Sequence, residues 1–510
     1  MKNILSLFIL TLLFGTALTA QSLDDAIRFS QTNITGTARS AAMGNAFGAL
    51  GGDFSSLSIN PAGIAIYRSS EASITPSLIY NNTTSNYFNT YSEDDKWTFP
   101  FNQIGYVATN KLLNDDEKGI ISTHFAMGYN RLSNFNQNSV IQGYGIESSK
   151  LGQFVIDAEG FYPDELDGFG NSLAFNTWLI DTLPGIGDQY FNAWEAIDQD
   201  GNVFWRANNG LDQRRVTEKD GYTGEYVFTM GINISNFLMI GGTFAIQNMH
   251  YRETSTYSEY NSYGMSPAFD TDLDYYNYHS YLNQSGTGFT FKFGVILKPL
   301  PILRLGASVH TPTYYSIWEH WDNQMVAHYK DDATFTEVSP AGEYNYKFRT
   351  PFKANGSAAL VLGKYMILSA DYEYSNYGSS EFKPSGYADD YLRVLNQQID
   401  ERFKKTHNLR GGIEFKPTPL VGVRAGISYQ DSPYKDEYQD KQANFLTYSG
   451  GVGYRTMRYF IDFAYMMTSR EYDYYNYNWD SSWNEYHGTP KPARMVSKDN
   501  QFILTLGYKF

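Results

Sequence analysis

Cysteine is absent from all 510 residues of the chain, and acidic residues outnumber basic ones. The absence of cysteine excludes disulfide bonds, thiolate metal sites and a lipid anchor carried on cysteine. The 39 Lys and Arg residues against 54 Asp and Glu residues give a formal net charge of −15. A chain this acidic is a poor partner for nucleic acid or for an anionic membrane surface.

Long hydrophobic runs are also absent once the first 20 residues are passed. The one such run, Ile4–Leu18, follows the basic Lys2 and is closed by the small residue Ala20. A basic N-terminal region, an apolar stretch and a small residue at the cleavage site are typical of a secretory signal peptide. The run is shorter than the roughly 20 residues that a membrane helix needs. We therefore predict that residues 1–20 are a signal peptide removed after Ala20.

The mean hydropathy of −0.43 is that of a water-soluble protein, but the aromatic content is 17%, with 43 Tyr and 34 Phe residues. A membrane β-barrel shows lipid only every second residue, so averaging along the sequence hides its apolar face. Its aromatic residues gather in two girdles at the membrane interfaces. The composition therefore favours a barrel over a soluble core.

Apolar and polar residues alternate in many short segments of the chain. Leu305, Ala307 and Val309 share one face of such a segment, and Arg304 and Ser308 share the other. This period of two predicts strands with one apolar and one polar surface. A soluble antiparallel sandwich alternates in the same way. Here the polar face repeatedly carries charge in mid-strand, which favours lipid outside and a polar lumen inside.

Short and long connections also alternate along the chain. Seven long, polar, Tyr-rich segments take turns with six short turns, which fall at Asn114–Lys118, Ser235–Asn236, Lys298–Pro301, Gly363–Lys364, Pro417–Leu420 and Thr456–Arg458. Outer-membrane barrels have this asymmetry, with tight periplasmic turns and long external loops. We predict an all-β fold: a 14-stranded antiparallel transmembrane β-barrel over residues 68–510, with both termini periplasmic. Its longest external loop, residues 131–220, contains Trp178 and is expected to fold locally.

Residues 21–67 do not follow the strand pattern. Ser22 with Asp25 predicts a capping box and a short helix through Phe29. Small residues dominate Gly36–Gly52, so backbone there can pack against backbone. Because fourteen strands enclose more space than their own side chains fill, we predict a hatch inside the barrel. The alternative is a periplasmic arm.

Within this segment, apolar residues recur at helix-like spacing and a turn signal follows them. We predict that the hatch contacts ligand through Met43, Phe47, Leu50, Asn60 and Pro61.

The final strand ends on the aromatic residue Phe510. Five of its residues share one apolar face: Phe502, Leu504, Leu506, Tyr508 and Phe510. Such a terminal strand is similar to the signal read by the outer-membrane barrel assembly machinery. We therefore expect that machinery to be a partner during biogenesis.

These features together resemble the FadL-type family of outer-membrane transporters for long-chain fatty acids and other hydrophobic compounds. The resemblance runs in order over nearly the whole chain after the signal peptide, through Ser58–Gly63, Gly286–Phe289, Arg304–Val309, Thr350-Pro351, Leu368–Asp371, Gly412–Phe415, Arg424–Tyr429, Gly451–Tyr454 and Asp462–Tyr465. It implies a fourteen-stranded barrel with an N-terminal hatch. It also implies a lateral opening at a kinked strand, which Gly128 could mark. The long segment 131–220 and the Tyr runs of the external loops depart from the family.

Signatures of catalysis and metal binding are missing from the sequence. There is no nucleophile elbow, HExxH motif or phosphate-binding loop, so we predict neither an enzyme nor a cofactor. The acidic run Asp270–Asp274 resembles the start of a calcium loop but lacks the glycine and glutamate that such a loop needs. Asp115–Glu117 is interpreted as a polar turn. His124 and His310 fall on lumen faces and are interpreted as hydrogen-bonded fillers.

Six charged residues fall on the predicted lumen faces: Arg304, Asp371, Arg410, Glu414, Arg424 and Asp462. Charges at such positions are costly unless they are hydrated or paired. We predict a network that braces the barrel and docks the hatch. The alternative is that one arginine meets a ligand carboxylate.

The sequence therefore predicts passive transport of hydrophobic or amphipathic small molecules, similar to long-chain fatty acids, across the outer membrane of a Gram-negative bacterium. External loops would catch the ligand, and movement of the hatch around Gly36–Gly52 would release it. Outer-membrane lipids and the ligand are the expected partners. The alternative is a non-transporting subunit of a secretion or assembly complex, whose Tyr-rich loops bind a protein partner.

Overall fold

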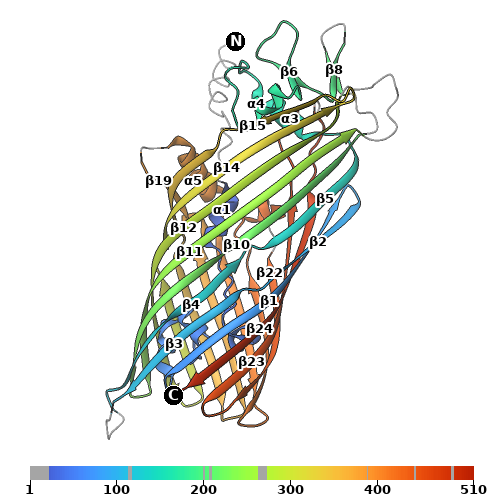
Figure 1. Cartoon of the computed structure of the whole chain (residues 1–510). Helices are drawn as coiled ribbons and strands as arrows, with labels where there is room; N and C mark the ends of the chain where they lie inside the picture. Colours follow the sequence, from blue (N-terminus) through green and yellow to red (C-terminus); the bar gives the residue numbers. More distant parts are fainter. Residues whose placement is uncertain are drawn as a thin grey trace.

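A closed, antiparallel, 14-stranded barrel dominates the computed structural model of the chain (Figure 1). The structure describes residues 22–112, 118–198, 202–205, 210–261, 273–386, 389–441, 444–483 and 487–510. The first and last strands close the barrel, with Glu71 paired to Lys509. The predicted fold class is confirmed. Three predicted features lie outside the described residues: the signal peptide, residues 114–117 of the turn Asn114–Lys118, and the acidic residues Asp270–Asp272.

Five of the fourteen barrel strands consist of two segments in line, joined by a bend. In chain order the strands are β1 Glu71–Tyr87; β2 Thr90–Thr98 with β3 Phe101–Lys111; β4 Ile120–Asn134 with β5 Gln137–Ile146; β10 Leu211–Ile234; β11 Leu238–Asn261; β12 Leu273–Leu300; β13 Leu303–His310 with β14 Tyr314–Tyr329; β16 Gly342–Arg349 with β17 Lys353–Leu362; β18 Met366–Asn376 with β19 Glu381–Pro384; β20 Lys405–Phe415; β21 Val421–Gln430; β22 Phe445–Arg455; β23 Tyr459–Tyr474; and β24 Ala493–Lys509.

The two ends of the barrel differ in their connections (Figure 1). At the short-turn end, Ser235, Asn236 and Phe237 join β10 to β11, and the first two have a φ of 53°. Left-handed backbone at both central residues suits a tight hairpin turn, and the Phe237 amide closes this turn by donating to the Ile234 carbonyl at 3.0 Å. The opposite end carries the elements that lie outside the wall and the hatch: β15 Thr334–Val338, η4 Tyr377–Ser379, α5 Asp390–Arg402, η5 Asp436–Lys441 and η6 Ser481–Trp483.

Apolar side chains cover the outside of the barrel near the short-turn end. On β13, Leu305 and Val309 are 42% and 44% exposed, while Ser308 and His310 face inward and are buried. Large exposed hydrophobic residues repeat in this way on neighbouring strands. A surface of this kind is stable against lipid rather than water. No helix in the described part of the chain is both long and apolar enough to cross a membrane.

Several strands extend much further from the membrane than the alternation predicts. β11 and β12 have 24 and 28 residues, where the pattern indicates residues 237–252 and 284–298. At about 3.3 Å per residue, β12 is roughly 90 Å long. A tilted spanning strand needs only about 9–11 residues. The long-loop half of the barrel therefore stands above the apolar band.

A small folded unit, which we call the cap, covers part of the long-loop end. It consists of α3 Lys150–Ala158, α4 Asn171–Asn176, β6 Ile180–Thr182, β7 Tyr190–Asn192, β8 Glu195–Ile197 and β9 Val203–Trp205. Its core includes the fully buried Trp194 and continues onto Tyr257, Tyr276 and Met325 of the barrel strands. The segment 131–220 thus contains a folded unit, together with β5 and the start of β10.

The segment before β1 runs through the lumen (Figure 1). It forms α1 Leu23–Ser30, α2 Ala38–Ala42, η1 Phe54–Ser58 and η2 Pro61–Ile66. Helix α1 lies in the long-loop half, where it contacts α5. The two 3-10 helices lie in the short-turn half and pack on β10, β11 and β12. We keep the name hatch for this segment.

Candidate functional site: the hatch seam and the outer chamber

Helix α1 begins as the sequence predicts. Ser22 and Asp25 form a capping box, and the Ser22 amide donates to Asp25 Oδ2 at 2.7 Å. The apolar face of the helix, with Ala26, Ile27 and Phe29, packs into a cluster of barrel and loop aromatics. This packing holds the start of the hatch against the wall, high in the lumen.

The helix-like spacing from Met43 to Leu50 does not produce a helix. Helix α2 ends at Ala42, and Gly44 and Asn45 follow with φ of 62° and 60°. Left-handed residues stop a right-handed helix. The chain instead turns repeatedly, so that its backbone stays close to the wall.

Glycines in the wall allow this close approach. A Cβ at Gly426 of β21 would lie 2.1 Å from the Gly44 nitrogen, and one at Gly306 of β13 would lie 2.5 Å from the Gly48 oxygen. On β11, a Cβ at Gly241 would lie 2.3 Å from the Pro61 oxygen. Backbone therefore meets backbone at several points from Gly44 to Pro61 of the hatch, and we call this contact the seam.

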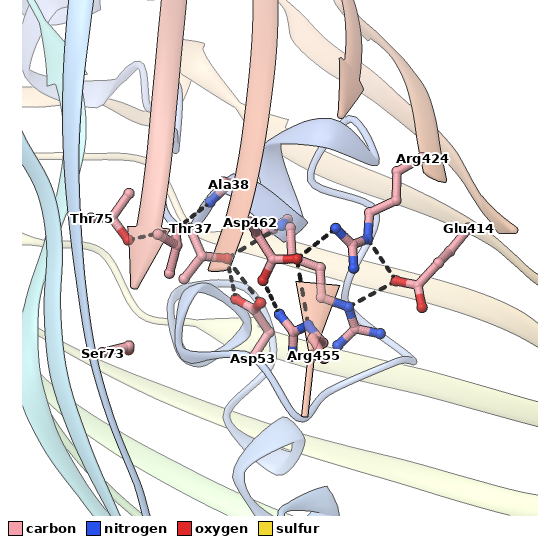
Figure 2. Close-up of polar contacts among 12 residues, drawn as sticks. Thr37, Ala38, Asp53, Ser73, Thr75, Glu414, Arg424, Arg455 and Asp462 are labelled. Atoms are coloured by element: carbon pink, nitrogen blue, oxygen red, sulfur yellow. Dashed lines mark hydrogen bonds and ion pairs between the residues drawn. The ribbon is translucent and has the colours of Figure 1, made fainter. Parts of the chain in front are cut away.

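Buried charges cross the seam (Figure 2). Arg424 Nε donates to Glu414 Oε2 at 2.8 Å, and its Nη1 donates to Asp462 Oδ1 at 2.7 Å. Arg39 of the hatch donates to the same Glu414 oxygen at 2.9 Å, and Arg455 pairs with Asp462. Arg424, Glu414 and Asp462 have side chains that are at most 1% exposed. Buried ions of opposite charge that are hydrogen-bonded in this way compensate one another.

Uncharged contacts continue the seam on the other side of α2 (Figure 2). The Ala38 amide donates to Thr505 Oγ1 at 2.7 Å, and Thr505 shares a hydrogen bond of 2.8 Å with Thr75. Thr37 donates from its hydroxyl to Asp53, which ties the start of α2 to the start of η1. The hatch is therefore bound both to the wall and to itself.

The other predicted lumen charges do not join this network. Arg304 donates to the Leu50 carbonyl at 2.7 Å, and Asp371 accepts from the Gly48 amide at 2.8 Å. Arg410 instead pairs with Glu373 of the neighbouring strand at 2.8 Å. The hatch residue Arg39 and the buried pair of Lys292 with Glu225 were not predicted. Arg39 stands in no strand pattern, whereas Lys292 alternates with the outward Phe291 and Phe293 and could have been found from that spacing.

The hatch residues predicted to contact ligand are all buried against the wall. Met43, Phe47 and Leu50 pack with Ile59 and Ala359. Asn60 donates to the carbonyls of Gly48 and Val295 at 2.7 and 3.2 Å, and Pro61 follows it as the first residue of η2. None of these five residues lines the cavity of about 380 Å³ that lies between α1 and the wall. A ligand role for them stays a prediction that depends on hatch movement.

The two lumen histidines are hydrogen-bonded. His310 Nε2 lies 2.8 Å from the Ile59 carbonyl of the hatch. His124 lies 2.8 Å from the Ser122 hydroxyl and 3.2 Å from that of Thr109. The described residues contain no cluster of acidic and histidine side chains suited to a metal ion.

A cavity of about 380 Å³ lies above the seam, between α1 and the wall. We call it the chamber. The hatch contributes Asp24, Ile27, Arg28, Gln31 and Asn33 to its lining, and the wall contributes residues of β1, β4, β5, β10, β11, β22, β23 and β24. By contrast, two other cavities that border the hatch, both closer to the seam than the chamber, hold only about 40 and 20 Å³. The lumen therefore has space for a small molecule above the seam, whereas the two cavities at the level of the seam are too small for one.

The wall is thin at one place beside η1. Gly105 of β3 is paired directly with Gly128 of β4. The Phe54 ring covers both from inside, 2.3 Å from a Cβ built at Gly105 and 2.5 Å from one at Gly128. Outside, an open groove runs over the same glycines between Ile104, Tyr106 and Met127. The two strands carry no side chain of their own at this pair, so the Phe54 ring and the Gln103 side chain cover the wall from the lumen side.

A closed 14-stranded barrel with an internal N-terminal hatch is the architecture of FadL-type barrels. The structure matches a FadL homologue of Pseudomonas aeruginosa with a TM-score of 0.54 and 14% identity, covering 94% of this chain and 100% of that one. It matches the toluene transporter TodX of P. putida with a TM-score of 0.52 and 13% identity, covering 94% and 99%. No protein-family model and no curated protein matches the sequence. At these identities the likeness establishes the fold, as the sequence motifs predict.

Proposed function

We propose that the chain is an outer-membrane channel for passive transport of hydrophobic or amphipathic small molecules. The observation that carries this proposal is the chamber, which places about 380 Å³ of space directly on a hatch that closes the lumen. The apolar band and the unequal barrel ends support an outer-membrane position with the long loops outside. The solved barrels of this fold include one described as a toluene transporter.

In this mechanism the ligand enters past the cap and rests in the chamber. The hatch then has to move, because the seam leaves no passage at its level. Gly36–Gly52 is the segment that moves in this mechanism, because it meets the wall directly along the seam. Its movement has to break the ion pair of Arg39 with Glu414 and the backbone contacts with the wall glycines. No energy source is needed, because the ligand moves down its own gradient.

Release has two alternative routes. In the lateral route, Phe54 withdraws from Gly105 and Gly128, and the ligand passes between the strands toward the apolar groove outside. In the axial route, η1 and η2 separate from β10 and β11, and the ligand leaves at the short-turn end. The thin wall favours the lateral route for an apolar ligand.

A second candidate function is a structural or interaction subunit. The cap exposes aromatic side chains to solvent, with Tyr162 55% and Trp178 57% exposed. Trp178 also has a φ of 60°, an uncommon backbone for a bulky residue. Surface aromatics of this kind are typical of protein-binding surfaces.

Native mass spectrometry of the protein extracted in mild detergent separates the two functions. We expect a barrel that carries one small molecule and releases it on activation in the gas phase. A fixed protein partner together with an empty chamber would contradict transport and support the interaction subunit.

A further inference from the structure

The charges that line the chamber already have partners. Arg28 pairs with Asp25 and donates to Gln284 at 2.8 Å, and Arg470 lies 3.4 Å from Asp499. Lys219 lies 3.8 Å from Glu253. The remaining acids are matched too, since Tyr434 donates to Asp24 at 2.9 Å and Arg494 contacts Asp473 at 3.1 Å. A ligand with its own charge would have to break one of these pairs, which removes much of the gain of binding it.

Two side-chain amides of the hatch are in the opposite situation. Gln31 and Asn33 line the chamber, and within the described part of the chain neither side-chain amide makes a hydrogen bond. Arg470 adds a buried Nε that has no partner among the described residues. An amide group offers both a donor and an acceptor. These groups are therefore available to a ligand hydroxyl, which also donates and accepts.

Aromatic rings form much of the remaining chamber surface, among them Phe135, Tyr251, Phe445 and Tyr472. The other polar side chains of the lining include Asn81, Asn136 and Gln137, which are hydrogen-bonded to the wall. Tyr472 is held in place because its hydroxyl accepts from Gln137 at 3.3 Å. Ring faces in this position favour a flat or ring-shaped ligand, because stacked and edge-to-face contacts add to the burial of apolar area.

We propose that the chamber takes a neutral, ring-shaped compound bearing at least one hydroxyl group, in preference to a plain hydrocarbon or a fatty acid. This narrows the ligand of the proposed transport function and rests on that function. A plain hydrocarbon would displace water from the two amides without giving them a hydrogen bond. This costs binding free energy, and the cost is what allows a polar site to reject an analogue that lacks the hydroxyl group. A fatty acid would bring a carboxylate to cations that are already paired.

Isothermal titration of the whole purified protein with p-cresol, toluene and oleate tests the proposal, with protein-free micelles as the blank. Toluene and p-cresol differ by one hydroxyl. We expect p-cresol to bind about tenfold more tightly than toluene, the effect of one hydrogen bond. The double variant Gln31→Leu/Asn33→Leu should lose this preference. Asn82→Leu is the control, because Asn82 is an amide of β1 that bonds Glu93 outside the lumen.

Each outcome of the titration decides a different point. Equal or tighter binding of toluene, or tightest binding of oleate, overturns the hydroxyl-bearing ligand but leaves transport standing. A preference for p-cresol that survives the double variant overturns the assignment to Gln31 and Asn33. Binding of none of the three probes overturns both the ligand class and the use of the chamber for small molecules.

Discussion

The two halves of the lumen use the same residue types in different ways. In the seam, Arg424 is 1% exposed and touches two carboxylates at 2.7 and 2.8 Å. In the chamber, Arg470 is 29% exposed and lies 3.4 Å from one carboxylate. This difference in burial follows from the position of the hatch. No space is left where the hatch backbone meets the wall glycines, whereas a cavity remains where α1 packs against one side of the barrel. Sealing and binding thus depend on how closely the hatch approaches the wall.

The largest effect of this difference is expected for the substitution Arg424→Met. This change leaves Glu414 and Asp462 with fewer partners in a dry seam, and breaking a buried pair in this way costs about 3–5 kcal/mol. We expect the free energy of unfolding, measured by urea titration in lipid vesicles, to fall by this amount. The barrel should also become leaky to ions in planar bilayers.

Arg470→Met is the matched change in the chamber. Because Arg470 is partly solvated, its removal should lower the free energy of unfolding by less than about 1 kcal/mol. Equal losses for the two variants would mean that the seam is no drier than the chamber, and the contrast between the two halves of the lumen would not hold.

A smaller effect is expected from Gly426→Ala. The added methyl would lie 2.1 Å from the Gly44 nitrogen, so the hatch must shift. Overpacking of this kind costs about 1–3 kcal/mol, and we expect a lower urea midpoint and a raised ion conductance. Gly356→Ala is the control, because a Cβ at Gly356 meets no atom within 4 Å. If both variants behave like the wild type, the seam is looser than the glycine contacts indicate.

The last expected effect concerns pH and is confined to the cap. Lys150 lies 5.3 Å from the ring centres of both Phe154 and Tyr278, and burial, with a smaller effect from Arg215, lowers its pKa to about 7. The unfolded lysine keeps its proton up to the ordinary pKa of 10.5, so between these two values the unfolded state binds more protons. The stability of the cap should therefore rise with pH across this window.

Limited proteolysis of the cap at pH 7 and pH 9 measures this rise. In Lys150→Met, resistance to the protease should be higher at pH 7 and should change little between the two pH values. Lys150→Arg keeps the charge at both values and serves as control. A rise of the wild-type size in Lys150→Met would assign the pH dependence to another group.

The sequence predicts the membrane half of the barrel well because lipid imposes the alternation there. On β13, Leu305 and Val309 face out and Ser308 faces in, as their spacing indicates. Above the apolar band both faces of a strand meet water or Tyr-rich loops, so the period of two fades, and the extension of β12 to Leu273 was missed.

For the hatch and the chamber, too, the sequence predicts only the features that depend on local signals. The capping box of α1 is a local signal and could be predicted, whereas the turns after Ala42 depend on contacts with distant strands. The chamber gathers single residues such as Gln31, Lys219 and Arg470 from distant segments, and no motif links them.

The proposed transport requires the hatch to move, and a reversible crosslink tests that requirement most directly. A Cβ at Gly48 would lie 3.0 Å from the Ser357 Cβ on β17, slightly closer than the roughly 3.5–4.5 Å of a disulfide. The chain has no other cysteine, so Gly48→Cys/Ser357→Cys gives one defined bond. We expect oxidation to stop p-cresol and toluene flux into proteoliposomes and reduction to restore it, whereas oxidation should not change the flux through either single variant. Unchanged flux through the oxidised protein would contradict a moving hatch.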